Sequence, residues 1–171
     1  MAEAVYFWNL RASRKAPYEA KVKRLLKLAG LGAEVRSGDL AAIKLHFGES
    51  GGTGHVRPLQ LAPLVAFLCK CGAKPFLTDT NTLYVGARGE SVSHAMTASR
   101  HGFDAANLGA PVIIADGLKG EHYKAVPFAG KHIREAYLAG DVLAADVLVV
   151  LSHFKGHELA GFGGALKNVA M

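Results

Sequence analysis

Short apolar runs rich in Val, Ile and Phe alternate along the chain with stretches of helical periodicity. This alternation is typical of β-α-β units whose strands form a parallel sheet. The expected strands are residues 4–8, 41–47, 75–78, 111–115 and 146–151. The expected helices lie in residues 11–27, 58–71 and 91–101, with a helical turn at 141–145. The pattern predicts an α/β fold in one domain (residues 1–171), with a mainly parallel sheet and helices on both faces in a Rossmann-like three-layer arrangement.

Two segments call for a separate interpretation. Residues 146–151 (DVLVVL) form the most apolar strand, and we expect it at the centre of the sheet because strands buried on both faces are continuously apolar. Gly, Lys and His interrupt residues 117–130, which predicts a β-hairpin or an irregular excursion. No glycine cap, polar tail or closing element follows Lys167, so we expect an incomplete sheet and a fragment of a longer protein.

Composition narrows the class of protein. Half of the 171 residues are hydrophobic and a fifth are charged, which excludes a disordered chain. No apolar run approaches the roughly 20 residues that a membrane-spanning helix needs. The N-terminus also lacks the basic region and long apolar stretch of a signal peptide. We therefore expect a cytoplasmic protein with no membrane partner.

The net charge of +6 resides in residues 11–27, because the bases and acids of the remaining chain balance. The apolar stripe of this predicted helix is Tyr18, Val22, Leu25, Leu26 and Ala29. Its basic face is either a solvated outer surface or a patch for an acidic partner or nucleic acid. Because no aromatic residues alternate with the bases and no groove-reading motif is present, we do not expect nucleic acid as the main partner.

Candidate chemistry follows the predicted strands, since ligands of open parallel sheets bind outside the carboxyl ends of the strands. Residues 46–58 (HFGESGGTGHVRP) form a Gly-rich loop that leads into a helix. Its backbone N–H groups and Arg57 suit an anion such as phosphate or carboxylate, and the alternative is a flexible surface loop. The loop contributes Gly52, Gly54 and Arg57 as candidate anion ligands and His46 and Glu49 as candidate metal ligands.

Two further loops carry polar side chains that can hydrogen-bond. Residues 78–84 (TDTNTLY) either line a ligand pocket or form a turn that satisfies its own backbone. Asp116 and Gly117 repeat this pattern after the next strand. The candidate substrate-binding or anion-binding residues are Asp79, Asn81 and Asp116.

The strongest local signal is residues 152–168 (SHFKGHELAGFGGALKN). Two histidines four residues apart, with a glutamate beside one of them, suit a divalent metal or proton exchange near neutral pH. A lysine at the end of the segment suits an anion or acts as a nucleophile. The candidate catalytic residues are His153, His157 and Lys167, Gly163 and Gly164 are candidate anion ligands, and His153 and His157 complete the metal set.

The cysteine count limits the choice of cofactor. Cys69 and Cys71 are the chain's two cysteines, too few for a four-thiolate cluster or a disulfide framework. Any metal that this chain holds alone must therefore bind to His, Asp, Glu or backbone groups.

Six blocks in order carry a resemblance to a known family: KLHFGE (44–49), GHVRP (54–58), GAKPFLTDTNTLY (72–84), HGFD (101–104), PVIIADGL (111–118) and LSHFKGHELAGFGGALKN (151–168). Together they resemble the domain of unknown function 362 family. Longer members carry a ferredoxin-like insertion or tail that binds [4Fe-4S] clusters, and they are described as iron-sulfur centre proteins. The resemblance implies a redox-linked domain whose electrons come from a ferredoxin-like region or an electron-transfer partner outside this chain.

A second, more distant resemblance is to the nickel-pincer lactate racemases. The matching residues are Arg57 before Pro58, and His157 followed ten residues later by Lys167 in a Gly-rich stretch. In that family the arginine binds the substrate carboxylate, the histidine exchanges a proton or hydride, and the lysine carries the cofactor.

We therefore expect a redox-linked, metal-assisted enzyme domain, an oxidoreductase or racemase-like enzyme, with a polar pocket for a small anionic substrate. The alternative is a non-catalytic domain that binds a phosphate-bearing ligand or a partner.

Overall fold

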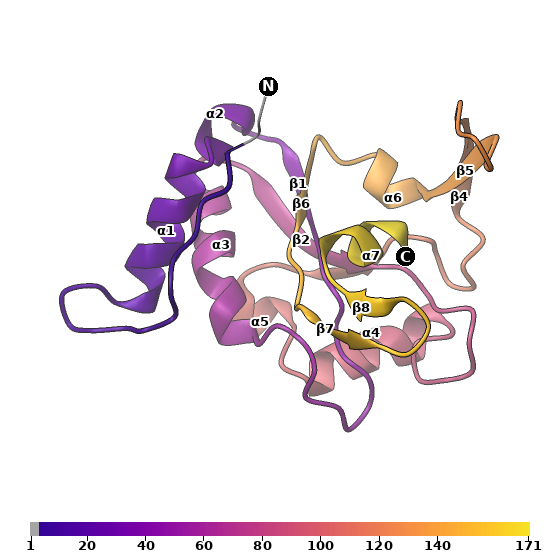
Figure 1. Ribbon diagram of the computed structural model, residues 1–171, viewed down its shortest axis with the longest axis horizontal. Helices are drawn as coiled ribbons and strands as arrows, with labels where there is room; N and C mark the ends of the chain where they lie inside the picture. The colour runs from indigo at the N-terminus through magenta and orange to yellow at the C-terminus, as the bar shows by residue number, and fades with distance from the viewer. Residues whose placement is uncertain (1–3) are drawn as a thin grey trace.

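Four of the predicted strands form one sheet in the computed structural model, which describes residues 4–171. The sheet order is β3 (Val112–Ile114), β2 (Lys74–Asp79), β1 (Leu40–Lys44) and β6 (Val147–Val150). All neighbouring strands are parallel, and Lys44 is level with Thr78 on one side and Val150 on the other. Figure 1 shows the sheet in the middle of the molecule with helices beside it. The expected α/β fold with a Rossmann-like parallel sheet is confirmed.

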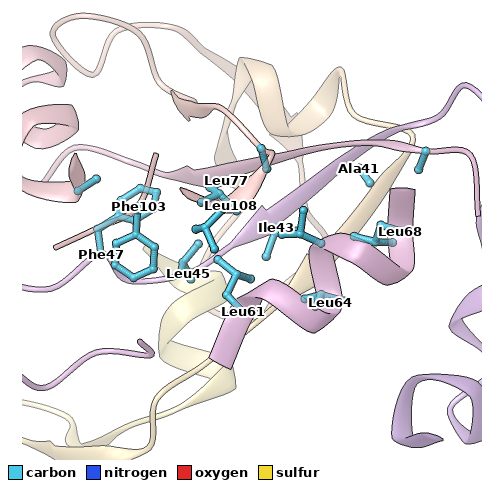
Figure 2. Close-up of a cluster of buried hydrophobic side chains, with 14 of the residues drawn as sticks. Ala41, Ile43, Leu45, Phe47, Leu61, Leu64, Leu68, Leu77, Phe103 and Leu108 are labelled. Atoms are coloured by element: carbon cyan, nitrogen blue, oxygen red, sulfur yellow. The ribbon is translucent and has the colours of Figure 1, made fainter. Parts of the chain in front are cut away.

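The core lies between the sheet and α3 (Pro58–Lys70). Residues of β1 alternate between the two faces of the sheet, so Ala41 and Ile43 point to the same side. These side chains pack with Leu61, Leu64 and Leu68, whose spacing puts them on one face of α3 (Figure 2). Pro58 suits the first turn of α3 because that position needs no N–H partner, and Gly72 ends the helix with φ +88°.

The remaining helices are α1 (Tyr18–Leu28), α2 (Leu31–Glu34), α4 (Ser91–Arg100), α5 (Ala105–Leu108), α6 (Gly140–Leu143) and α7 (Ala165–Ala170). The helices expected at 58–71 and 91–101 and the turn at 141–145 are confirmed. The helix expected in 11–27 begins only at Tyr18, because Pro17 stands before it in an extended conformation. Within residues 4–171, no helix is long and apolar enough to cross a membrane.

Two small antiparallel hairpins complete the described chain. β4 (Tyr123–Pro127) pairs with β5 (Glu135–Ala139) and projects from the body of the molecule (Figure 1). The hairpin prediction for residues 117–130 is correct in kind, but the second strand lies beyond that range. β7 (Lys155–His157) pairs with β8 (Gly161–Gly163), and α7 follows them.

The strand expected at residues 4–8 is wrong. These residues form no strand, and Val5 and Phe7 are 91% and 86% exposed. An apolar run becomes a strand only where a neighbouring backbone supplies hydrogen bonds. The indole of Trp8 instead lies near the charged groups of Lys21 and Arg24, 5.7 and 5.2 Å from its ring centre.

The central position expected for residues 146–151 is also wrong. β6 is an edge strand of the sheet formed by the described residues, and Leu148 is 45% exposed. The centre belongs to β1 and β2, which are buried from Ala41 to Lys44 and from Pro75 to Asp79. Small and charged residues occur in these buried strands, so an apolar run alone did not identify the centre.

Candidate functional site

A pocket of about 160 Å³ lies at the carboxyl ends of β1, β2 and β6. The chain continues from β1 through α3 to β2 on one side, whereas β6 lies on the other side of β1. The strand order therefore changes direction at β1, which makes this the position where open α/β sheets bind ligands. The loop after β1 contributes His46 and Glu49, the last residue of β2 is Asp79, and the segment after β2 contributes Tyr84 and Arg88. The segment after β6 adds His153, Lys155, His157, Gly163, Lys167 and Asn168.

Buried ion pairs form the floor of the pocket. Lys44 ends β1 and donates to Oδ1 of Asp79, which ends β2, at 2.6 Å. The guanidinium of Arg88 donates to Oδ2 of the same carboxylate at 3.3 Å. All three side chains are almost completely buried, so each charge depends on its partners for compensation.

Arg88 also connects this floor to the loop after β1. Its Nε donates to Oε2 of Glu49 at 3.3 Å, and its terminal nitrogen pairs with Oε1. The phenol of Tyr84 donates to the same Glu49 oxygen at 2.6 Å. Burial alone would raise the pKa of Glu49, but the hydrogen bonds from Arg88 and Tyr84 outweigh it and lower that pKa to about 2. Glu49 is therefore ionised at neutral pH, and both of its oxygens accept hydrogen bonds.

His46 faces the pocket as a neutral hydrogen-bond donor. Its Nδ1 accepts the backbone N–H of Gly48 at 2.9 Å, so the neutral ring carries its proton on Nε2, which lies 3.7 Å from Glu49. Burial, followed by the positive charges of Arg88 and Lys155, lowers the pKa of His46 to about 4. A ring with this tautomer has no free lone pair for a metal ion.

His157 has the same tautomer for a different local reason. Its Nδ1 accepts the backbone N–H groups of Leu159 and Ala160, at 3.2 and 3.1 Å, in the turn between β7 and β8. The Nε2 of the neutral ring therefore carries the proton and can donate to a ligand. His153 also lines the pocket and is exposed, so it is the better placed of the two for exchanging protons with solvent.

Lys155 and Lys167 converge above the floor. A Cβ placed on Gly163 would lie 3.5 Å from Cδ of Lys167 and 3.8 Å from Cγ of Lys155, so both stems pass the same backbone position. Lys155 donates to the carbonyl of Gly54 at 2.9 Å, which ties the β7–β8 hairpin to the loop after β1. Among the described residues, neither lysine has a carboxylate within 4 Å.

Asn168 of α7 joins β1 to β6 beside the pocket. Its amide nitrogen donates to the carbonyls of Lys44 and Leu151, at 3.2 and 3.1 Å, and to the hydroxyl of Ser152 at 3.0 Å. Its Oδ1 lies 3.3 Å from Nζ of Lys44. One side chain thus holds α7 against the two strands whose loops form the pocket.

Several residues predicted for the site lie outside the pocket. Asn81 donates its backbone N–H to Asp116 at 3.0 Å and its side-chain amide to the carbonyl of Gly117 at 2.9 Å. Asn81 and Asp116 therefore join the loops after β2 and β3 to each other, and neither residue lines the pocket. The other residues that do not line the pocket are Arg57, Gly52 and Gly54. Arg57 is exposed at the start of α3, and Gly54 contributes only its carbonyl to Lys155.

The predicted site residues did not include Lys44, Tyr84, Arg88, Lys155 and Asn168. Lys44 had a usable signal, because a lone charge in the apolar run AAIKLHF (41–47) must find a buried partner. Arg88 had none, since it lies in a loop of ordinary composition and is buried only by the folded chain.

The candidate metal ligands line the same pocket but do not form a metal site. Within residues 4–171, no group of three or more His, Cys, Asp or Glu side chains is arranged to hold a metal ion. Cys69 is exposed at the end of α3 and Cys71 packs against the core, and two thiols cannot supply the four ligands of an iron-sulfur cluster. The described residues therefore do not fit the metal or cluster that the resemblances imply.

Comparison with known proteins identifies a family over most of the chain. Residues 41–171 match the family model described as "Domain of unknown function (DUF362)". The matched region begins in β1 and includes every strand of the sheet and every residue of the pocket. No curated protein and no solved structure matches the chain.

Proposed function

The chain belongs to the DUF362 family, whose description assigns no activity, and from the geometry of its pocket we propose that this domain binds a small anionic molecule. The anion lies at the carboxyl ends of β1 and β6, where Lys155 and Lys167 contact its charge. His157 donates a hydrogen bond to it from Nε2. The single observation that carries this proposal is the charge balance of the pocket.

The carboxylates of the pocket are already compensated. Asp79 is paired with Lys44 and Arg88, and Glu49 is paired with Arg88. Lys155 and Lys167 therefore contribute positive charge that no described carboxylate pairs with directly. A pocket lined by cations that have no carboxylate partner attracts a ligand of opposite charge.

The volume limits the size of the anion. A cavity of about 150 Å³ holds a molecule the size of benzene. The pocket is of similar size, so a small carboxylate or inorganic phosphate fits within it, whereas a nucleotide would extend outside.

Thermal unfolding at constant ionic strength tests the proposal, with propionate and inorganic phosphate as probes. A ligand that binds only the folded state raises the melting temperature until the site saturates. We expect such a rise in the native protein and a smaller one in Lys155→Gln and Lys167→Gln. The control is Lys74→Gln, which removes an exposed lysine at the opposite end of β2.

The outcome separates this proposal from its alternatives. Equal rises in all variants, or a rise matched by sodium chloride alone, would contradict a specific anion site. Loss of the rise in chelator would favour a metal-assisted enzyme instead. The redox role and its electron-transfer partner have no support among the described residues, which provide no cluster ligands.

A further inference from the structure

Lys155 differs from the other lysines near the pocket in its surroundings. Lys44 is buried and donates to the carboxylate of Asp79 at 2.6 Å. Lys155 instead donates to a neutral acceptor, the carbonyl of Gly54, at 2.9 Å. An amine and an ammonium group can both make that hydrogen bond, so the contact does not require Lys155 to be charged.

The surroundings of Lys155 lower the pKa of its amine below the usual value. Burial is the main cause, the positive charge of Arg88 lowers the pKa further, Glu49 raises it in part, and Lys167 lowers it. The convergence of the two lysine stems over Gly163 gives the geometric basis for this coupling. A desolvated lysine beside a second cation is the arrangement that activates an amine as a nucleophile.

The hairpin directs Lys155 and His157 into the same space. Side chains alternate along a strand, so these two residues of β7 lie on one face, and both line the pocket. Their partners in β8 are Gly163 and Gly161, which have no side chains to fill that face. The space beside the amine of Lys155 on this face is therefore open to a ligand.

We propose that Lys155 forms an imine with the carbonyl carbon of a small 2-oxo acid whose carboxylate is held by Lys167. This inference rests on the proposed anion-binding function and specifies its substrate class. The amine nitrogen forms a bond to the carbonyl carbon, and the carbon–oxygen double bond is broken. The oxygen leaves as water with the two amine protons, so no oxidant, reductant or cofactor takes part.

Pyruvate is a suitable probe because it has as many non-hydrogen atoms as benzene, the size that such a pocket admits. Propionate is its matched control, since it carries a carboxylate on a chain of the same length but no carbonyl to attack. The protein is incubated with pyruvate and sodium cyanoborohydride, which reduces an imine to a stable secondary amine. Intact mass and peptide mapping then locate the modification.

We expect one dominant modification on Lys155, with a mass gain equal to the oxo acid less one oxygen atom. Excess propionate should suppress it by occupying the carboxylate site. Lys155→Arg retains a positive charge and a donor to Gly54 but cannot form an imine, so labelling should fall to the level of exposed lysines such as Lys27. Lys167→Arg is the matched variant, because it keeps the positive charge for the carboxylate and should still be labelled on Lys155.

Three results would overturn the inference in different ways. Stabilisation by both propionate and pyruvate without labelling of Lys155 would leave the anion site intact and refute the imine. Absence of both stabilisation and labelling would refute the anion site together with the imine. Equal labelling of Lys155→Arg and the native protein would show that the amine of Lys155 is not selectively reactive.

Discussion

At the scale of single residues, the main feature is a pair of buried polar side chains, those of Arg88 and His94. Arg88 is 2% exposed and compensates both Glu49 and Asp79. His94 is fully buried behind Asp79, with its Nε2 3.8 Å from Oδ2, and neither ring nitrogen has a hydrogen-bond partner. Its ring packs edge-on against Phe47, with 5.7 Å between the ring centres. The protein therefore holds this imidazole as a neutral, nearly apolar group.

The burial of His94 makes stability depend on pH. Burial, offset in part by Asp79, lowers the pKa of His94 from its usual 6.5 to about 4. The unfolded chain takes up a proton below pH 6.5 whereas the folded protein does so only near pH 4, so stability is lost as the pH falls through this window. We expect a slope of up to about 1.4 kcal/mol per pH unit from this residue. Urea unfolding of the native protein and His94→Phe between pH 7 and 4 measures it.

The variant should have a shallower slope, because phenylalanine keeps the packing on Phe47 and does not titrate. Part of the slope should remain, since burial also lowers the pKa of His46 to about 4. The control, His132→Ala, removes an exposed histidine and should leave the slope unchanged. An unchanged slope in His94→Phe would mean that His94 binds protons equally in the folded and unfolded states.

At the scale of elements, a single side chain fixes the last helix. Asn168 donates to the carbonyls of Lys44 in β1 and Leu151 after β6, and the N–H of Leu151 donates to the same Lys44 carbonyl at 2.9 Å. α7 spans only six residues, too few to be stable as an isolated helix. Its position, and therefore that of Lys167, depends on this contact.

We expect Asn168→Ala to destabilise the protein by about 1–2 kcal/mol, since it removes hydrogen bonds to part-buried acceptors. Urea unfolding measures the loss, and hydrogen exchange should show faster opening of α7. Val169→Ala is the matched control, because it makes the same gain in helix propensity at a neighbouring, 58% exposed position. Similar stability of the two variants would show that Asn168 does not anchor the helix.

At the scale of the whole molecule, the sheet order decides where the core lies. β1 has a neighbouring strand on each side, and its Ile43 is completely buried. β6 lies at the edge of the sheet formed by the described residues, and its Leu148 is half exposed. The most apolar strand of the sequence is therefore less buried than a strand that contains a lysine. The positions of the pocket and of the core both follow from this order.

Two alanine substitutions test this arrangement. Ile43→Ala should cost about 3 kcal/mol, because it opens a cavity in the core. Leu148→Ala should cost roughly 1 kcal/mol, since much of its side chain is already in water. Urea unfolding compares the two, and equal losses would mean that β6 is buried on both faces.

Much of the fold was predictable because it depends on local patterns. The apolar runs at 41–47, 75–78 and 111–115 became β1, β2 and β3, and proline and glycine marked the ends of α3. The equally apolar run at residues 4–8 did not form a strand. Its pattern matched the others, but whether a strand forms depends on hydrogen-bond partners from distant parts of the chain.

The candidate site was predictable in its location more than in its members. The alternation of strands and helices by itself determined a parallel sheet. Helical connections make the strands run in the same direction, so the polar loops that follow them lie at one end of the sheet. His46, Glu49, Asp79, His153, His157, Gly163, Gly164 and Lys167 line the pocket as that reasoning predicted. Asn81 and Asp116 also follow strands of this sheet, yet they hydrogen-bond to each other and do not line the pocket.

Only the tertiary structure decided which charges compensate one another. Arg88 reaches Glu49 across 39 residues of sequence, and Asn168 reaches Lys44 across 124. The physical reason is that the energy of a charge depends on burial and on its neighbours in space, which no local pattern encodes. The sequence therefore determined the kind of fold and the end of the sheet that carries the chemistry. The folded chain decided that Lys155 and Lys167 are the cations left for a ligand.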